Sequence, residues 1–529
     1  MQVVLYDTSL RDGAQMEGIS YSAEEKLEIT RRLDDLGVSY IEGGWPGSNP
    51  KDADYFQRVQ RLPLRNAVVT AFSMTRRAGG DTADDPNIRA LMDSGASVCT
   101  LVAKTWDLHV DKVLHTTQAE NLRMIADSVR YLRAQGRRVF LDAEHFFDGY
   151  RANRDFALKC LMAAAESGAE CLVLCDTNGG SITTDIRTAV RAVQKLTKLD
   201  LGIHVHNDCD LAVANSLAAL DEGVVQVQGT VNGYGERCGN ANLCSIIPVL
   251  QLKMGVPLVA PQKLAELTAL SHYVAELANI RPEPRAPFVG LNAFTHKAGL
   301  HADAMSKVEE SYQHIPPASV GNRKRILVSE LAGRSNVVQK AEELGLKLDA
   351  RDPRVRQIVN KVKAMEQLGY QYEGAEASFE MLVRRMDEGY TAPFDLVDFM
   401  VVVEKHRRES RRDSDTMLSE ATVKVVVDGR QFHTAAEGNG PVNALDAALR
   451  KALVEFYPQV ANVNLVDYKV RILEGTQGTE AQVRVLIESS YGERVWRTVG
   501  CSSNIIEASW MALVDSLEYW LASVMPQAG

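Results

Sequence analysis

Eight short runs of apolar and β-branched residues alternate with amphipathic helical patterns over about the first 255 residues, and this alternation constrains the fold most strongly. The runs occupy residues 3–7, 39–43, 67–72, 97–102, 138–143, 171–175, 201–206 and 224–229. Eight strands and eight helices in this length are typical of a (β/α)8 barrel. A doubly wound open sheet is the alternative, but the Gly-x-Gly-x-x-Gly pattern after its first strand is missing. The sequence therefore predicts an α/β fold that begins with a (β/α)8 TIM barrel.

The chain beyond the barrel divides into two further regions. Residues 261–280 are predicted to form one helix, and the three prolines of the following stretch, 281–287, mark a boundary. Residues 290–410 have a mainly helical, polar pattern that ends in a charged run typical of a solvated helix face or linker. We therefore expect a barrel over 1–280, helical linker subdomains over 281–412 and a C-terminal α+β domain over 413–529.

The C-terminal region contains a short internal repeat. Residues 434–453 align without a gap on residues 498–517. The matched pairs are Ala444/Ala508, Ala448/Ala512, Leu449/Leu513 and Leu453/Leu517. A repeat of strands plus a helix predicts a pseudo-symmetric module that is distinct from the barrel.

Composition and charge exclude several classes of protein. A chain of 529 residues exceeds a single hydrophobic core, so two to four domains are expected. The net charge of -10 argues against nucleic acid as the main partner. The sequence has no uninterrupted apolar run of about 18 residues, so no membrane-spanning helix is predicted. The N-terminal residues do not resemble a signal peptide. The 8 cysteines lack the spacing of a zinc ribbon or redox motif, which favours reduced thiols in a cytoplasmic protein.

Polar residues gather at the predicted C-terminal ends of the strands, where barrel enzymes place their active sites. His204 and His206 are two residues apart in the seventh strand, so both imidazoles enter the same space. Two imidazoles with a carboxylate from another strand form a site for a divalent ion such as Zn²⁺, Mn²⁺ or Mg²⁺. Two structural histidines with satisfied hydrogen bonds are the alternative.

Three further residues are candidates for the surroundings of this ion. Asp12, which follows the first strand, is predicted to be the carboxylate ligand, and a turn or helix-capping Asp is the alternative. Asn240 either adds a weaker oxygen ligand or shapes its glycine-rich loop. Asp7 is expected to point into the barrel and to orient a ligand.

Three more residues offer binding or proton-transfer chemistry at the same end of the barrel, and two further candidates follow the barrel in sequence. Arg11 can stabilise a developing oxyanion, unless it is a surface residue. Glu144 is either the partner of Arg11 or a proton-transfer group, because an inward carboxylate needs a partner. Thr177 offers its hydroxyl to a substrate carboxylate or caps a turn. Beyond the barrel, His301 and Asp303 can bring an acid/base pair to an adjacent site.

Four long motifs connect the chain to a known family. They are Asp7-Thr-Ser-Leu-Arg-Asp-Gly-Ala-Gln15, His204-Val-His-Asn207, Asn232-Gly-Tyr-Gly-Glu-Arg-Cys-Gly-Asn240 and His296-Lys-Ala-Gly-Leu-His301. They resemble the 2-isopropylmalate, homocitrate and citramalate synthases of the DRE-TIM metallolyase superfamily. Residues 40–52, 328–336 and 496–510 resemble the citramalate synthase branch of that family in particular. The resemblance extends over nearly the whole chain.

This resemblance implies a metal-dependent condensation of acetyl-CoA with a 2-oxo acid, followed by hydrolysis of the thioester. Asp12, His204 and His206 match the metal ligands of the family, and Asn240 matches a further or looser one. The 2-oxo acid would chelate the ion through its keto oxygen and carboxylate.

The resemblance also implies roles for the other candidates. Arg11 and Thr177 would hold the 2-oxo acid, and Glu144 matches an active-site acid. His301 matches a catalytic histidine that the segment after the barrel supplies across a homodimer. Whether His301, with Asp303, or Glu144 is the base stays open.

The same family carries a feedback-regulatory domain, which the repeated module resembles. Isoleucine is the expected effector for a citramalate synthase, which would use pyruvate in isoleucine biosynthesis. A larger 2-oxo acid such as 2-oxoisovalerate is an alternative substrate, since one or two methylenes change discrimination only about 10–200-fold. A retro-aldol hydroxyacyl-CoA lyase is an alternative of another class, although the long C-terminal module argues against it.

Overall fold

The computed structural model describes residues 3–297, 301, 304–305, 307–328, 333–346, 348–349, 351–404, 418–473 and 481–524. The chain forms two compact units. The first contains Met1–Phe294 and His314–Lys324, and the second contains Thr295–Gln313 and Arg325–Gly529. Among the described residues, no helix has the length and apolar character needed to cross a membrane.

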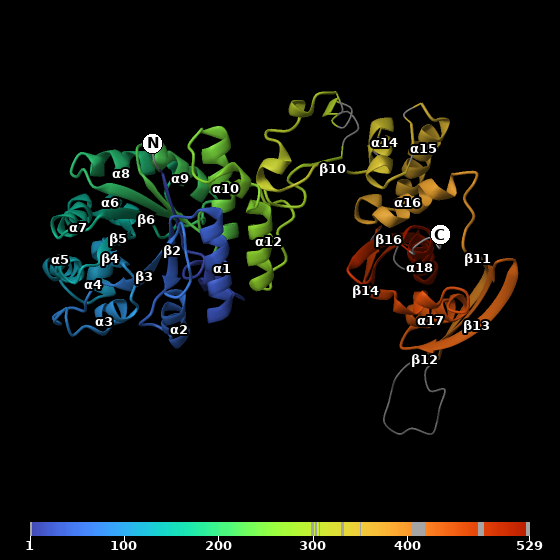
Figure 1. The fold of residues 1–529 in the computed structure, drawn as a ribbon, viewed down its shortest axis with the longest axis horizontal. Helices are drawn as coiled ribbons and strands as arrows, with labels where there is room; N and C mark the ends of the chain where they lie inside the picture. Colours follow the sequence, from blue (N-terminus) through green and yellow to red (C-terminus); the bar gives the residue numbers. More distant parts are fainter. Residues whose placement is uncertain are drawn as a thin grey trace, which may run out of the picture. The chain divides into compact units, whose positions relative to one another are not determined.

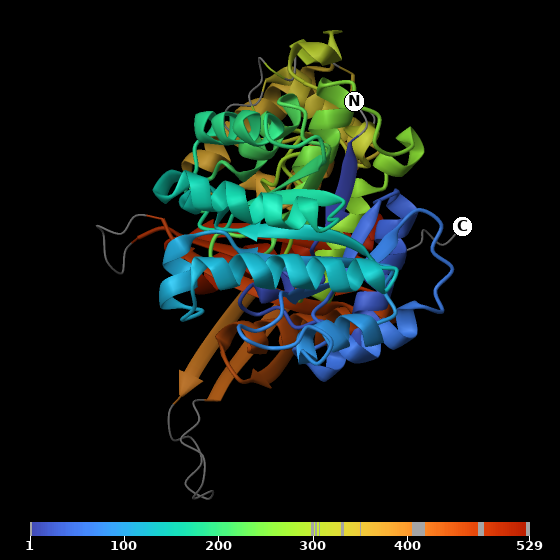
Figure 2. The same cartoon turned by 90° about the vertical axis from the view of Figure 1, so that its left-hand side faces the viewer.

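The first unit is a closed barrel of parallel strands surrounded by helices (Figures 1 and 2). The strands are β1 (Val4–Asp7), β2 (Tyr40–Gly44), β3 (Val68–Met74), β4 (Val98–Lys104), β5 (Arg138–Glu144), β6 (Cys171–Asp176), β7 (Asp200–Val205) and β8 (Gln226–Gly229). β1 closes the barrel by pairing with β8, with Leu5 opposite Val227. The structure confirms the predicted barrel and the order of its eight strands.

Helices cover the outside of this barrel. They are α1 (Ala23–Leu36), α2 (Pro50–Val59), α3 (Pro86–Asp93), α4 (Asp107–Lys112), α5 (Gln118–Ala134), α6 (Phe146–Ala152), α7 (Arg154–Glu166), α8 (Thr183–Gln194), α9 (Ala212–Asp221), α10 (Leu243–Pro248), α11 (Pro261–Leu264) and α12 (Leu267–Leu277). Local signals define their ends: α1 begins with a capping box between Ser22 and Glu25 and ends at Gly37, whose φ of 103° favours glycine.

The prediction of one helix over residues 261–280 is wrong. A turn at Ala265 separates α11 from α12, because the N–H of Glu266 donates to the carbonyl of Lys263 instead of continuing the helical ladder. Gly321 packs against the carbonyl of Ala265, where any larger residue would clash. A segment more than 50 residues further along the chain therefore packs against the interruption.

The interior of the barrel contains a polar cluster centred on Tyr6. Its hydroxyl oxygen lies 2.9 Å from Oε1 of Glu42, 2.8 Å from Oγ1 of Thr70 and 2.7 Å from Oγ1 of Thr100. All four side chains are fully buried. Buried polar groups are costly unless they are hydrogen bonded. Here Tyr6 of β1 finds its partners on the next three strands, β2, β3 and β4.

Asp34 anchors the end of α1 to the loop that precedes β3. Its buried carboxylate accepts hydrogen bonds from the backbone N–H groups of Arg65, Asn66 and Ala67, at 3.0, 2.7 and 2.7 Å. Burial alone would raise the pKa of Asp34, but these donors lower it below the usual value. The anchor therefore stabilises the fold fully above the unfolded pKa of about 3.9, and the stabilisation declines as pH falls through the lower folded pKa.

We expect Asp34→Asn to destabilise the barrel by about 1–3 kcal/mol at neutral pH, because the amide cannot accept all three bonds. The difference from the parent should shrink as the pH is lowered below about 4. Thermal unfolding between neutral and acidic pH measures this effect. Asp35→Asn, at the exposed neighbouring position, is the matched control and should have little effect. A difference that grows on acidification would contradict the assignment.

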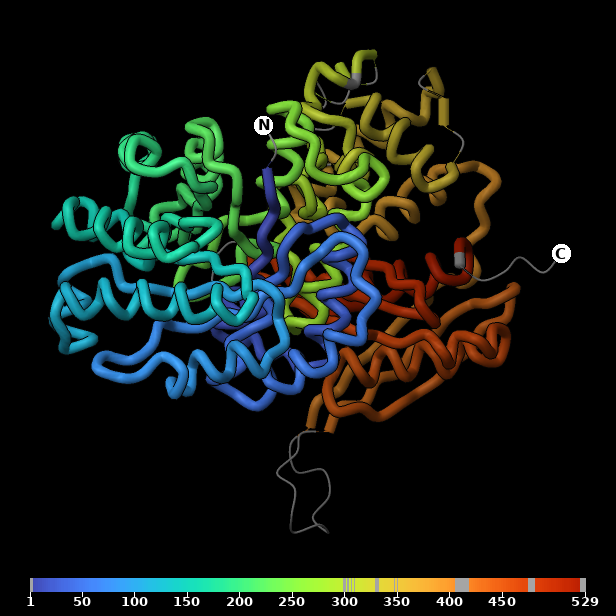
Figure 3. Tube along the Cα trace, turned by 60° about the vertical axis from the view of Figure 1, so that its left-hand side comes forward, coloured from blue at the N-terminus to red at the C-terminus, as the bar shows by residue number. Residues whose placement is uncertain are grey.

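The second unit begins with helices and ends in a repeated α+β module (Figure 3). Its elements are β9 (Thr295–His296), β10 (Arg325–Ile326), α14 (Arg334–Glu343), α15 (Pro353–Gln367), α16 (Glu376–Arg385), β11 (Asp395–Glu404), β12 (Leu418–Val427), β13 (Arg430–Gly438), α17 (Pro441–Leu453), β14 (Asn464–Ile472), β15 (Val483–Tyr491), β16 (Arg494–Ser502) and α18 (Ile505–Tyr519). β11–β13 and β14–β16 form two antiparallel sheets, each followed by a helix.

The predicted repeat is confirmed down to single hydrogen bonds. The hydroxyl of Thr434 donates to the carbonyl of Ala448 at 2.7 Å, and that of Thr498 donates to the carbonyl of Ala512 at the same distance. These are equivalent positions in the alignment of the two halves. The expectation of mainly helical structure up to residue 410 fails at β11, which joins the sheet of the module.

Candidate active site

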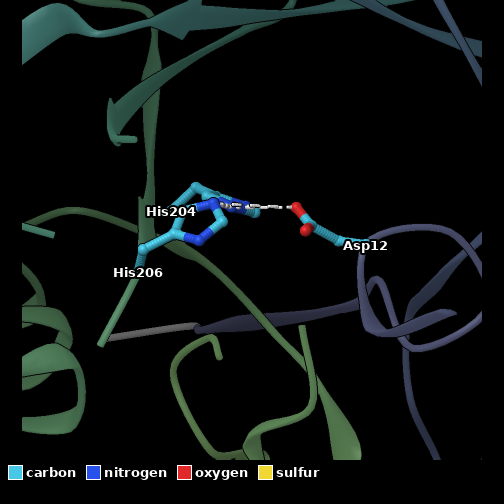
Figure 4. A group of neighbouring side chains, drawn as sticks. All are labelled: Asp12, His204 and His206. Atoms are coloured by element: carbon cyan, nitrogen blue, oxygen red, sulfur yellow. Dashed lines mark hydrogen bonds and ion pairs between the residues drawn. The ribbon is translucent and has the colours of Figure 1, made fainter. Parts of the chain in front are cut away.

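Asp12, His204 and His206 bring their side chains together at the C-terminal end of the barrel strands (Figure 4). Nε2 of His204 lies 3.2 Å from Oδ2 of Asp12, and Nε2 of His206 lies 4.0 Å from the same oxygen. The two Nε2 atoms are 3.4 Å apart. Asp12 follows β1, His204 lies in β7, and His206 follows it directly. The predicted convergence of these three side chains is confirmed, whereas their role as ligands stays a prediction.

The donor set and its electrostatics fit a divalent cation. Oδ1 of Asp12 and Nδ1 of His206 are buried and have no hydrogen-bond partner among the described residues. Burial would raise the pKa of Asp12, but Arg11 and the two histidines lower it well below its usual range. Burial and the nearby His204 lower the pKa of His206 to about 4, so this imidazole is neutral at neutral pH. One carboxylate and two imidazoles then face one another, as in many divalent metal sites.

Asn240 shapes its glycine-rich loop, and its role as a ligand stays a prediction. It forms an isolated antiparallel bridge with His206, and its amide nitrogen donates to the carbonyl of Tyr234 at 3.1 Å. Its Oδ1 is buried and has no partner among the described residues. The side chain therefore shapes the loop and also leaves one oxygen free to act as a ligand.

Arg11 is held by Glu42, not by Glu144. Nε of Arg11 donates to Oε2 of Glu42 at 2.6 Å, and Nη1 donates to Oδ2 of Asp12 at 3.1 Å. The guanidinium also lies 3.9 Å from the ring centroid of Phe72. The prediction that Glu144 pairs with Arg11 is therefore wrong. Glu42 was missed, although its spacing of two from Tyr40 in a strand was a usable sign of an inward side chain.

Glu144 instead forms an ion pair with Lys104, from the end of the neighbouring strand β4. Sequence reasoning did not single out this lysine. The hydroxyl oxygen of Thr177 accepts a hydrogen bond from the N–H of His145 at 2.8 Å, which joins the residues that follow β6 and β5 and does not cap the turn of Thr177 itself. Its hydroxyl proton remains available to a ligand, since Thr177 lines the same cavity as Glu144 and Lys104.

Asp7 has a structural role at this end of the barrel. Its carboxylate accepts hydrogen bonds from the backbone N–H and the hydroxyl of Ser9, both at 2.9 Å. Ser9 in turn accepts from the N–H of Val231, after β8. Burial raises the pKa of Asp7 to about 7. Because these bonds go to Ser9, the expectation that Asp7 orients a metal ligand is not met.

A cavity of about 270 Å³ opens above the Asp12–His204–His206 cluster. The cluster and the polar side chains of Arg11, Glu144 and Thr177 line part of it, and its apolar wall consists of Trp45, Phe72, Met74, Val102 and Leu114.

A larger cavity of about 760 Å³ lies in the second unit, against α16 and α18. Among the charged groups that line it, Arg385 forms ion pairs with Asp515 and Glu518.

His301 lies in the second unit, where its imidazole stacks on the ring of Tyr312 with centroids 4.2 Å apart. Asp303 lies outside the described residues. The catalytic roles of His301 and Asp303 therefore stay predictions.

Comparison with known proteins agrees with this architecture. Residues 2–274 match the HMGL-like family, residues 288–369 the homocitrate synthase post-HMGL domain-like family, and residues 373–521 the LeuA allosteric (dimerisation) domain. The (R)-citramalate synthase of Geobacter sulfurreducens is 52% identical over 98% of this chain and 97% of its own length. Those of Synechocystis and Aquifex aeolicus are 52% and 50% identical, over 98% of this chain and over 96% and 98% of their own lengths. The chain therefore belongs to the HMGL-like family, in the group that contains the (R)-citramalate synthases.

Proposed function

We propose that this chain is an (R)-citramalate synthase, which condenses acetyl-CoA with pyruvate and then hydrolyses the thioester to give citramalate and CoA for isoleucine biosynthesis. The observation that carries the proposal is the buried Asp12–His204–His206 cluster at the floor of the barrel cavity. The cavity beside this cluster, of about 270 Å³, has room for a short 2-oxo acid.

A divalent ion, Zn²⁺, Mn²⁺ or Mg²⁺, completes this site in the proposal. Asp12, His204 and His206 would hold it, with Oδ1 of Asn240 as a further donor. When bound, such an ion supplies a Lewis acid that polarises a keto carbonyl.

The surrounding side chains supply the other parts of the reaction. Arg11, which Glu42 fixes in place, stabilises the negative charge that develops on the keto oxygen. The hydroxyl of Thr177 donates to the carboxylate of pyruvate. A base, either Glu144 or His301 with Asp303, removes a methyl proton of acetyl-CoA, and the resulting carbon attacks the keto carbon. The alkoxide takes up a proton, and water then cleaves the thioester to release CoA.

The substrate is tested by following thiol release from acetyl-CoA with a panel of 2-oxo acids. We expect kcat/KM to be highest for pyruvate, with 2-oxoisovalerate about 10-fold or more behind, because its branched chain must fit the same cavity. Reactions without a 2-oxo acid correct for the two exposed thiols, Cys209 and Cys238. Preference for 2-oxoisovalerate would identify the other synthase activity. Cleavage of a hydroxyacyl-CoA without condensation would establish the lyase instead.

A homodimer formed through the C-terminal module is part of the proposal. Two edge strands of the module, β11 and β14, expose apolar side chains, including Val397 and Met400 on β11 and Val466 and Ile472 on β14. Exposed apolar groups concentrated in this way are typical of protein interfaces. Analytical ultracentrifugation should show a dimer that Val466→Lys weakens. The equivalent change Val113→Lys, at an exposed valine of the barrel unit, is the control and should leave the dimer intact.

Isoleucine is the proposed effector of the repeated module, and the match to an allosteric domain over residues 373–521 supports this assignment. We expect isoleucine to inhibit the condensation more strongly than leucine or valine in initial-rate measurements. Equal rates with and without isoleucine would contradict this part of the proposal.

The absence of disulfides among all 8 cysteines supports a cytoplasmic location.

A further inference from the structure

His204 is held from behind by Gln228, a residue of β8 to which the reaction described above gives no part. Oε1 of Gln228 lies 2.8 Å from Nδ1 of His204. β7 and β8 are neighbouring parallel strands in which Ile203 pairs with Val227, so His204 and Gln228 are next to each other. Gln228 is fully buried, so bulk water does not compete for this contact.

The direction of this hydrogen bond decides which nitrogen of His204 carries the proton. An imidazole that ligates a metal through Nε2 needs its proton on Nδ1, and that proton needs an acceptor. The carbonyl oxygen of a glutamine accepts, whereas its amide nitrogen only donates. The orientation of the Gln228 amide therefore selects the tautomer of His204.

The far side of Gln228 fixes that orientation. Its amide nitrogen lies 3.1 Å from Oδ1 of Asp142 and 3.3 Å from Oε1 of Gln226. The amide oxygen of Gln226 can only accept a hydrogen bond, and so can the ionised carboxyl of Asp142, so the amide nitrogen faces these two oxygens. The amide oxygen must then face His204.

We propose that Gln228 is a positioning residue that keeps His204 in its Nδ1–H tautomer, and that Asp142 sets the direction of the Gln228 amide. The inference rests on the proposed function, because it takes Nε2 of His204 as a metal ligand. His206 offers a contrast within the same site, since its Nδ1 has no partner among the described residues. The support from Gln228 is therefore specific to His204.

Metal affinity tests the proposal without reference to activity. Metal-free, full-length protein is titrated with Zn²⁺ in competition with a chromogenic chelator. Gln228→Met keeps the length of the side chain but removes both amide atoms, and we expect its Zn²⁺ affinity to fall about 10–100-fold. Gln313→Met is the control, because Gln313 is also a buried glutamine but belongs to the second unit and shows no hydrogen bond to Gln228 or His204 among the described residues. Its affinity should stay close to that of the parent.

The possible results separate this inference from the proposed function. Unchanged affinity in Gln228→Met would overturn the role of Gln228 and leave the metal site intact. Failure of the parent protein to bind a divalent ion would overturn the metal site itself.

Nitrogen-15 NMR of metal-free protein labelled at histidine provides a second measurement, which stays decisive if Gln228→Met does not fold. The measurement is made in an Asp12→Ala background, which removes the carboxylate oxygen 3.2 Å from Nε2 of His204. At alkaline pH, where the imidazole is neutral, we expect His204 of this protein to carry its proton on Nδ1. The His204 signal is identified by its loss in His204→Ala. Asp142→Asn replaces the acceptor with an amide that also donates, so Gln228 can turn over and the tautomers should mix. A proton on Nε2 in the Asp12→Ala protein with Gln228 and Asp142 intact would overturn the proposal.

Discussion

His204→Ala protein is expected to lose about a thousandfold or more of its kcat/KM for pyruvate and acetyl-CoA. The variant removes one of the two imidazoles from the buried cluster, and a bound metal ion contributes several kcal/mol of stabilisation to a developing negative charge. Steady-state rates of thiol release measure the loss. The same measurement on parent protein treated with a chelator should show a similar loss, which added Zn²⁺ or Mn²⁺ reverses.

The control for this prediction is His272→Ala. His272 is a histidine of α12 that contacts the carbonyl of Val289, and it does not line the barrel cavity. Its variant should keep nearly the parent activity. Full activity of His204→Ala in metal-free buffer would contradict the assignment of the metal site and the proposed reaction that depends on it.

The second large effect is expected from Glu42→Gln. Arg11 then loses the charged partner that holds its Nε at 2.6 Å, although Asp12 still contacts its Nη1. Loss of a single oxyanion-stabilising group typically costs about 10²–10³ in kcat, and we expect a decrease of about 100-fold. The melting temperature of the barrel unit should also fall, because removing one partner of a buried ion pair leaves the other charge poorly compensated.

The kinetic constants separate a disturbed Arg11 from a general loss of fold. Because Arg11 acts most strongly as charge develops, kcat should fall more than KM rises. Glu276→Gln, at an exposed site on α12, is the matched control and should leave both constants unchanged. A Glu42→Gln protein with parental kcat would show that Arg11 keeps its orientation without this partner.

The fold of the barrel unit could be predicted from the sequence because its signals are local. Each strand is a short apolar run between amphipathic helices, and the spacing of His204 and His206 alone places both imidazoles on one face. Asp12 could be added because all the strand ends of a barrel meet at one mouth. These inferences need no knowledge of which side chains are in contact.

The missed features depend on contacts between distant parts of the chain. The sequence alone does not show whether Arg11 pairs with Glu42 or with Glu144, because both residues are carboxylates on barrel strands. Gly321 packs against the break between α11 and α12, a contact that no periodicity within the helix reveals. β11 pairs with β12, which begins only at Leu418. Because this pairing is not visible in the sequence, the run of valines in β11 was assigned to the preceding helical region.

The Tyr6 cluster also limits how the barrel can be redesigned. Thr70→Val would count as a nearly isosteric replacement in an ordinary hydrophobic interior. Here it removes the hydrogen bond between Thr70 and the Tyr6 hydroxyl, which also donates to Glu42. Since the same carboxylate holds Arg11, a change of side chain at Thr70 can affect the Arg11 guanidinium through Tyr6 and Glu42. Libraries that vary the interior of this barrel for thermostability should therefore keep Tyr6, Thr70 and Thr100 fixed and be screened for turnover as well as for melting temperature.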